Sequence, residues 1–234
     1  MVDTNNPERQ FIVTKNKGET KIEQVGENTN FKEDSVLKSA FGLNLYKELL
    51  PEKIIIVEGS GDRYFLNHCL ALYNFRNFAI KSAGGASKIP TFAGLLSNEH
   101  LQSYVILDSD KEGKDIKKKI IETYKQFYSD KNLMTLKEIL NTLPDNSTIE
   151  DLYPIEFIKN NLKIELGEDL EIDDKSAVII QLKNLDEKLK NDKQKLESLK
   201  TKLSNAFTKE FHNLEKLKSC ERLSGFLDNL ILKL

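Results

Sequence analysis

Three pairs of acidic residues stand where an apolar run of the chain gives way to a loop. Carboxylates that converge in one crevice would repel one another and raise each other's pKa. A divalent cation removes that repulsion, and an acidic set without His or Cys suits Mg²⁺ or Mn²⁺, which take hard oxygen ligands. Such a cation polarises a phosphate or activates water, so these residue types point to phosphoryl chemistry. The pairs are Glu58 and Asp62, Asp108 and Asp110, and Glu150 and Asp151.

Each acidic pair also has an interpretation in which it only supports the fold. Asp62 could cap the N-terminus of a helix. Glu150 and Asp151 could belong to a capping pair that begins at Ser147 or Thr148. The cation site is the favoured interpretation for all six acidic residues, and above all for Glu58 and Asp108 taken together at this spacing.

The sequence predicts that strands and helices alternate in the part of the chain that positions these residues. Ile54–Val57 is typical of a short strand buried on both faces, and Phe78–Ser82 and Ser103–Asp108 are the next two. Helical patterns separate them, which favours βαβ units and a parallel sheet. Right-handed crossovers send the carboxyl ends of such strands to one edge. We therefore expect an α/β, Rossmann-like fold, a mostly parallel sheet flanked by helices, with Glu58 and Asp108 on one edge.

Glycines near the acidic residues predict a phosphate-binding backbone. Gly59, Gly61 and Gly85 follow predicted strands and would let the main chain approach a phosphate closely. Lys88, just after the Gly84-Gly85 loop, could contact a phosphate, with an exposed surface lysine as the alternative.

The rest of the chain divides into an N-terminal and a C-terminal region. Residues 1–50 suggest a β-hairpin around residues 15–18 and a linking helix, residues 51–155 the catalytic domain, and residues 156–234 a helical appendage. Residues 129–147 fit either a helix or a strand. Leucine spacing from Leu182 to Leu217 predicts a helical hairpin or a weak coiled coil, packed internally or forming a dimer seam.

Composition excludes several classes of protein. The chain has 234 residues, 39% hydrophobic and 31% charged, with a formal net charge of −2, which gives no global sign of nucleic-acid binding. It lacks the roughly 20 consecutive apolar residues that a membrane span needs. Its first residues show no signal peptide, and Cys69 and Cys220 lack metal-ligand spacing. We expect a cytoplasmic protein with reduced thiols.

The acidic motifs resemble the Toprim domain. Ile55-Ile-Val-Glu-Gly-x-x-Asp62 is followed by Ile106-Leu-Asp-Ser-Asp110 and Gly113. The resemblance covers roughly residues 50–155, and the paired signature is more specific than either half. Among Toprim proteins, the OLD (overcoming lysogenization defect) family nucleases are the most similar, since they also carry an acidic motif like Ile149-Glu-Asp-Leu152.

This resemblance implies a function and partners. Glu58, Asp62, Asp108 and Asp110, with help from Glu150 and Asp151, would bind two Mg²⁺ or Mn²⁺ ions for hydrolysis of a DNA phosphodiester. The family also uses a late lysine, for which Lys202 is the candidate. OLD relatives are associated with antiphage defence. The partners would be DNA, an ATPase domain or subunit, and further copies of the chain in a homo-oligomer. The alternative is a non-cutting Toprim-like scaffold or regulatory module that binds nucleic acid or a partner protein.

One departure from the family pattern concerns ATP. OLD proteins carry a glycine loop ending in Gly-Lys-Ser/Thr, which does not occur in this sequence. We therefore expect no ATP site in this chain, and an ATPase supplied in cis, if the chain is a C-terminal fragment, or in trans. The N-terminal hairpin without a partner sheet favours the fragment.

Overall fold

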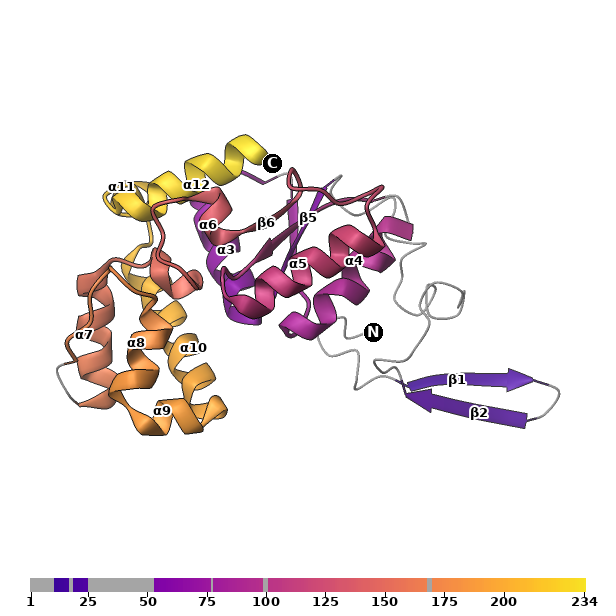
Figure 1. Cartoon of the computed structure of the whole chain (residues 1–234), viewed down its shortest axis with the longest axis horizontal. Helices are drawn as coiled ribbons and strands as arrows, with labels where there is room; N and C mark the ends of the chain where they lie inside the picture. The colour runs from indigo at the N-terminus through magenta and orange to yellow at the C-terminus, as the bar shows by residue number, and fades with distance from the viewer. Residues whose placement is uncertain (1–10, 17–18, 25–52, 77, 99–100, 168–169) are drawn as a thin grey trace.

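A four-stranded parallel sheet forms the centre of the computed structural model, in the order β4-β3-β5-β6 (Figure 1). Its strands are β3 (Lys53–Val57), β4 (Phe78–Ser82), β5 (Gln102–Leu107) and β6 (Leu133–Thr135). The chain thus starts at an inner strand, moves out to β4, and crosses back to the other side of β3. The structure describes residues 11–16, 19–24, 53–76, 78–98, 101–167 and 170–234.

The inner strand β3 is apolar on both faces because both faces are covered. Ile55 and Val57 belong to the core on the side of α3 (Ser60–Leu72) and the C-terminal helices. Ile54 and Ile56 belong to a second core with α4 (Ile89–Asn98) and α5 (Lys111–Thr123). The continuous apolar run of the sequence reflects this double burial. The expected α/β sheet flanked by helices is confirmed.

Short helices complete the sheet domain and lead into the C-terminal part of the chain. The ambiguous segment 129–147 contains both predicted elements, since β6 runs directly into α6. Helix α5 ends at Thr123, where the chain gives way to turns before β6. These short helices are η2 (Ala86–Lys88), α6 (Leu136–Ile139) and η3 (Ile149–Leu152).

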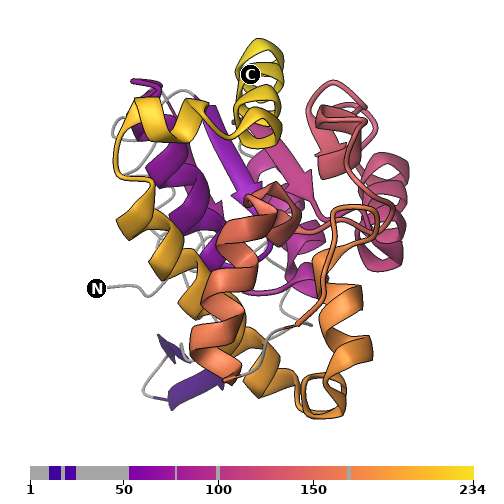
Figure 2. The same ribbon diagram turned by 90° about the vertical axis from the view of Figure 1, so that its left-hand side faces the viewer.

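The C-terminal part contains helices and loops, with no strand among its described residues, and it lies against one side of the sheet domain (Figures 1 and 2). In Figure 2, α7, α8 and α10 stand beside one another, and α10 also contacts α3. Its helices are α7 (Ile155–Leu166), α8 (Val178–Leu185), α9 (Glu187–Asn191), α10 (Lys193–Glu210), α11 (Leu214–Lys218) and α12 (Glu221–Lys233).

The leucine stripe of this part packs inside the molecule. Leu182, Leu196, Leu203 and Leu217 are buried in the core that also contains Phe65 of α3. The stripe is divided among α8, α9, α10 and α11 instead of forming two long helices, because loops interrupt the periodicity. Internal packing, one of the two predicted roles, is therefore what the described residues show.

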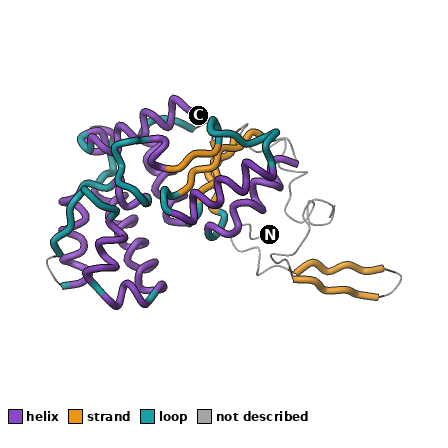
Figure 3. The backbone as a smooth tube through the Cα atoms, viewed as in Figure 1, coloured by secondary structure: helices purple, strands orange, loops and turns teal. Residues whose placement is uncertain are grey.

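The N-terminal hairpin forms a sheet of its own (Figure 3). Strands β1 (Phe11–Asn16) and β2 (Glu19–Gln24) pair in antiparallel fashion, as the sequence predicts. The linking helix expected before residue 50 lies outside the described residues. In the part of the chain that the structure describes, no helix is both long enough and apolar enough to cross a membrane.

Candidate active site: a carboxylate cluster at the carboxyl edge of the sheet

Glu58 follows the last residue of β3 and is anchored through its main chain. Its carbonyl oxygen accepts hydrogen bonds from the amides of Gly84 and Gly85, at 3.1 and 3.0 Å, and from the Ser82 hydroxyl at 3.2 Å. The loop after β4 thus closes over the end of β3, as expected for parallel strands ending at one edge. The carboxylate of Glu58 is left half-buried and available for other contacts.

Asp62 lies in the first turn of α3 and closes that turn. Its Oδ2 accepts a hydrogen bond of 2.8 Å from the amide of Gly59, the N-cap residue. An acidic side chain at this position is also favoured by the helix dipole. The capping role that the sequence allowed for Asp62 is therefore present, although the carboxylate also takes part in the charge interactions described below.

The segment from Asp108 to Asp110 joins β5 to α5 and is fixed by its middle residue. Ser109 is fully buried; its amide donates to the carbonyl of Ser147 and its Oγ accepts from the amide of Lys137, both at 2.8 Å. Asp110 is the N-cap of α5 and accepts from the Gly113 amide at 2.8 Å. Both acidic side chains are thus held at the edge of the sheet.

Gly113 allows the first turn of α5 to approach the end of β5. A Cβ atom at this position would lie 2.1 Å from the carbonyl oxygen of Asp108, an impossible contact with main-chain atoms. The glycine is therefore required for the close packing of this turn, and its place in the motif follows from the geometry.

Glu150 comes from η3 and is buried opposite a lysine of α10. Its Oε2 accepts from the Thr148 hydroxyl at 2.6 Å, and its Oε1 lies 3.6 Å from Nζ of Lys200. Glu150 is 3% exposed, so its charge is removed from water almost completely. Lys200 was missed by the sequence analysis, whereas Thr148 was considered as a cap and does form a capping box with Asp151. A signal existed for Lys200, which adjoins the buried Leu196 and Leu203 on the same helix.

The electrostatics show that these side chains share one environment, here called the carboxylate cluster: Glu58, Asp62, Asp108 and Glu150, with Lys200. Burial, followed by the neighbouring Asp62, raises the pKa of Glu58 to about 7. Burial and the carboxylates of Asp62 and Glu150 raise the pKa of Asp108 well above its usual range. Burial and Glu150 likewise raise the pKa of Asp62.

Lys200 is the positive charge within this group of carboxylates. Burial lowers its pKa, but the carboxylates of Glu150 and Asp108 outweigh this effect, so the pKa lies above its ordinary value. The ammonium group is therefore fully charged at neutral pH. Four mutually repelling carboxylates against one lysine leave the cluster with an excess of negative potential, which favours binding of a cation.

Two residues predicted for the site lie elsewhere or are used differently. Lys202 is exposed on α10, and its Nζ pairs with Glu165 of α7 at 2.5 Å, away from the carboxylate cluster. Asp151 is 1% exposed, and both of its carboxylate oxygens accept main-chain hydrogen bonds, from Thr148 at 2.8 Å and from Val178 at 2.9 Å. The structure thus brings Lys200, and not Lys202, to the cluster.

The predicted phosphate-binding glycines lie beside Glu58 or Asp62, but their amides are partly engaged. The Gly59 amide donates to Asp62, and the Gly85 amide donates to Glu58. Gly85 has φ of 127°, a conformation that only glycine adopts easily. Gly61 lies in the first turn of α3 with open space where a Cβ would stand. Lys88 ends η2, half-buried.

An open groove of about 660 Å³ begins beside the cluster at Asp110. It runs between α5, the segment around Thr148, and α8. Ile116 and Ile179 contribute apolar surface. Its charged walls are mixed, with Lys111, Lys119 and Lys183 beside Asp110, Glu112 and Asp115.

The donor chemistry of the cluster suits a hard divalent cation, but the side chains do not form a finished cage. Among the described residues, no three His, Cys, Asp or Glu side chains are arranged so that they could hold a metal ion without moving. Carboxylate oxygens without His or Cys fit Mg²⁺ or Mn²⁺. Side-chain rotation, with Lys200 giving way, would be needed before the carboxylates could share a cation.

Comparisons with known proteins found one family model and several solved structures that are similar to this chain. Residues 49–110 match the family model of the overcoming lysogenization defect protein-like Toprim domain. The C-terminal region of the Burkholderia pseudomallei OLD protein superposes with a TM-score of 0.45 at 10% identity, covering 80% of this chain and all of that one. The C-terminal region of the Xanthomonas campestris pv. campestris OLD protein gives 0.41 at 14% identity, covering 78% and 95%. No curated protein matches the sequence.

The family match spans the strand–helix unit that carries Glu58 and Asp62 and ends at Asp110. It thus includes four of the predicted acidic residues and stops before Glu150 and Lys200. Over residues 49–110 this chain is therefore similar to the OLD-like Toprim domain.

Proposed function

We propose that this chain is a divalent-metal-dependent DNA endonuclease. The observation that carries the proposal is the carboxylate cluster, in which half-buried acidic side chains with raised pKa values lie near one another at the carboxyl edge of a parallel sheet. Keeping such charges together is unfavourable for the fold alone, which indicates a functional requirement. Toprim domains generally bind divalent metal ions, and the family is nuclease-related.

The residues of this chain would divide the work as follows. Glu58, Asp62, Asp108, Asp110 and Glu150 would hold one or two Mg²⁺ or Mn²⁺ ions through oxygen atoms. The bound ions would supply charge stabilisation at the phosphate and an activated water. Ser109 and Gly113 would keep the acidic segment after β5 rigid.

Lys200 would serve both the empty and the loaded site. It offsets part of the negative charge while the carboxylates have no cation. Once a bound cation offsets the negative charge of the cluster, the ammonium group of Lys200 can contact the negatively charged phosphodiester. We therefore assign to Lys200 the role expected for a late lysine, and we do not carry Lys202 forward.

The groove beside Asp110 is a suitable path for the nucleic acid. Its three lysines can pair with backbone phosphates, and Ile116 and Ile179 can contact a sugar or base. As the resemblance to OLD proteins implies, the ATPase would be a domain or subunit acting in cis or in trans. The biological setting would be antiphage defence in the cytoplasm.

The alternative is a Toprim-like module that binds nucleic acid or a partner without cutting. It is favoured by the absence, among the described residues, of a ready-made arrangement for a metal. Incubation with supercoiled plasmid and Mg²⁺ or Mn²⁺ separates the two. We expect nicking by the wild type and a loss of at least about a hundredfold for Glu58→Ala and Asp108→Ala.

Lys202→Ala is the matched control and should cut like the wild type, since its exposed partner Glu165 lies outside the cluster. Equal nicking by wild type and both acidic variants would attribute it to a contaminant and overturn the proposal. Cation binding in calorimetry without any cleavage would favour the non-cutting module.

A further inference from the structure

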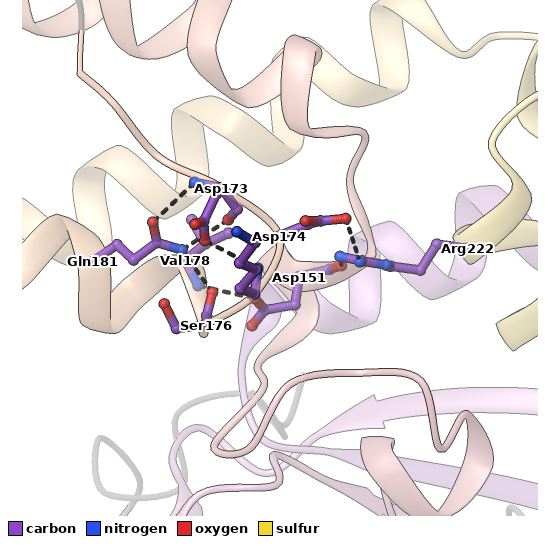
Figure 4. Close-up of polar contacts among 8 residues, drawn as sticks. Asp151, Asp173, Asp174, Ser176, Val178, Gln181 and Arg222 are labelled. Atoms are coloured by element: carbon purple, nitrogen blue, oxygen red, sulfur yellow. Dashed lines mark hydrogen bonds and ion pairs between the residues drawn. The ribbon is translucent and has the colours of Figure 1, made fainter.

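Glu150 and Asp151 are adjacent in η3 and face opposite ways. Glu150 points to Lys200 and the carboxylate cluster. Asp151 points to the start of α8, where its Oδ1 accepts from the amide of Val178 (Figure 4). Glu150 is among the main causes of the raised pKa of Asp62 and of Asp108, and Asp151 is not. The second acidic residue of the motif is therefore outside the cluster.

Asp151 supplies something that α8 lacks. The helix begins at Val178, and its N-cap residue is Ala177, which has no side-chain acceptor for the free amides of the first turn. Helix N-termini need such an acceptor, and the helix dipole favours a negative one. Asp151, 27 residues earlier in the chain, takes the place of the local cap.

The same carboxylate is connected to Glu150 through Thr148. Oδ2 of Asp151 accepts from the Thr148 amide at 2.8 Å, and the Thr148 hydroxyl donates to Glu150 at 2.6 Å. All three side chains are buried. A continuous series of hydrogen bonds therefore runs from the N-terminus of α8, through Asp151 and Thr148, to the Glu150 carboxylate.

Arg222 of α12 holds this segment from another side. Its guanidinium donates to the carbonyl oxygen of Asp151 at 3.3 Å and to Oδ2 of Asp174 at 3.2 Å (Figure 4). Two C-terminal helices, α8 and α12, thus meet at Asp151. We call Asp151, Thr148, Val178 and Arg222 the Asp151 cap.

We propose that Asp151 is a positioning residue, which holds Glu150 at the carboxylate cluster by joining it to α8, and that it does not bind the metal. The proposal rests on the proposed function only in taking Glu150 as a cation ligand. It also gives the C-terminal helices a direct part in the Toprim site, because displacement of α8 would be transmitted to Glu150.

The test compares Asp151→Ala with a double variant in which only the N-terminal cap of α8 is restored. Ala177→Ser places a local N-cap at α8, so the double variant Asp151→Ala/Ala177→Ser should recover the thermal midpoint lost by Asp151→Ala. We expect Mn²⁺ affinity and plasmid nicking to stay about tenfold or more below wild type in both variants. Recovery of affinity together with stability would overturn the positioning role.

A third variant distinguishes positioning from direct ligation. Thr148→Val keeps the Asp151 carboxylate and removes the hydroxyl that orients Glu150. Positioning predicts an Mn²⁺ affinity reduced to a similar degree as in Asp151→Ala, and direct ligation by Asp151 predicts wild-type affinity. Calorimetry with Mn²⁺ distinguishes positioning from direct ligation even if the wild type cuts no DNA. Failure of the nuclease proposal is therefore a separate result. Wild-type Mn²⁺ affinity in Thr148→Val would overturn the inference.

Discussion

The carboxylate cluster and the Asp151 cap are neighbouring regions that treat buried negative charge in different ways. In the cap, a single carboxylate receives one main-chain amide on each oxygen. In the cluster, several carboxylates face one another and share Lys200. A carboxylate whose two oxygens both accept main-chain hydrogen bonds stabilises the fold. Carboxylates that still repel one another can bind a cation. Adjacent residues of one acidic motif, Glu150 and Asp151, fall on either side of this division.

A glycine near each region has a different amount of space around it, and substitution of these glycines gives the largest expected difference in stability. Gly113→Ala would place a Cβ 2.1 Å from the Asp108 carbonyl beside the cluster. Gly225→Ala, on the helix that carries Arg222, meets only Leu140 at 3.8 Å. We expect Gly113→Ala to lose about 2–4 kcal/mol of unfolding free energy, and Gly225→Ala to lose none and to gain up to about 1 kcal/mol from helix propensity.

Urea denaturation without metal measures both changes. Equal stability of the two variants would show that the start of α5 can move away from β5, and that the cluster is less rigid than the contacts of Gly113 indicate.

The second prediction concerns the charge balance of the cluster. Lys200→Met removes the cation from among buried carboxylates and should cost about 2–3 kcal/mol without metal, since an unpaired buried charge is unfavourable. Lys202→Met breaks an exposed pair with Glu165 and should cost under about 1 kcal/mol. Because a bound cation replaces the lost charge, Mg²⁺ should stabilise Lys200→Met more than wild type.

Thermal unfolding with EDTA and with excess Mg²⁺ checks this comparison. The same Mg²⁺ effect on Lys200→Met and on Lys202→Met would mean that Lys200 does not compensate the cluster.

The sheet and most of the acidic residues could be predicted because their signals are local. The run Ile54–Val57 shows a doubly buried strand by itself, and the carboxyl edge of parallel strands brings Glu58 and Asp108 to the same place. The ends of β3, β4 and β5 are predictable to within one residue, because Glu58 directly follows β3, Asp108 directly follows β5, and the Gly84-Gly85 loop lies just after β4.

Lys200 and the role of Asp151 depend on contacts that no local pattern contains. Lys200 is 50 residues from Glu150, its ion-pair partner, on a helix with several other lysines. Its position beside Leu196 and Leu203 favours it over Lys202 only after the register of α10 is known. Asp151 caps a helix 27 residues away, and the acceptor is needed because Ala177 offers none.

The final prediction uses pH to separate the two regions. Glu58 has a pKa raised from 4.5 to about 7, so its contribution to stability is complete below pH 4.5 and is lost as pH rises through 7. Asp151 has a pKa raised from 3.8 to about 6, so its contribution is lost about one pH unit lower. Metal-free protein should therefore be less stable at pH 8 than at pH 5, and Glu58 should account for about 2 kcal/mol after allowance for its partial exposure.

Glu58→Gln should remove the share of the decline that falls between about pH 4.5 and 7 and leave in place the share of Asp151, which falls between about pH 3.8 and 6. Mg²⁺ should do the same in the wild type, because it favours the ionised form of a carboxylate in the cluster and has no access to the buried, amide-bonded Asp151. Urea titrations at four pH values, with EDTA or Mg²⁺, measure both effects. A decline that Mg²⁺ leaves unchanged above pH 6 would place the cation outside the cluster, and the distinction between the two regions would then lose its functional meaning.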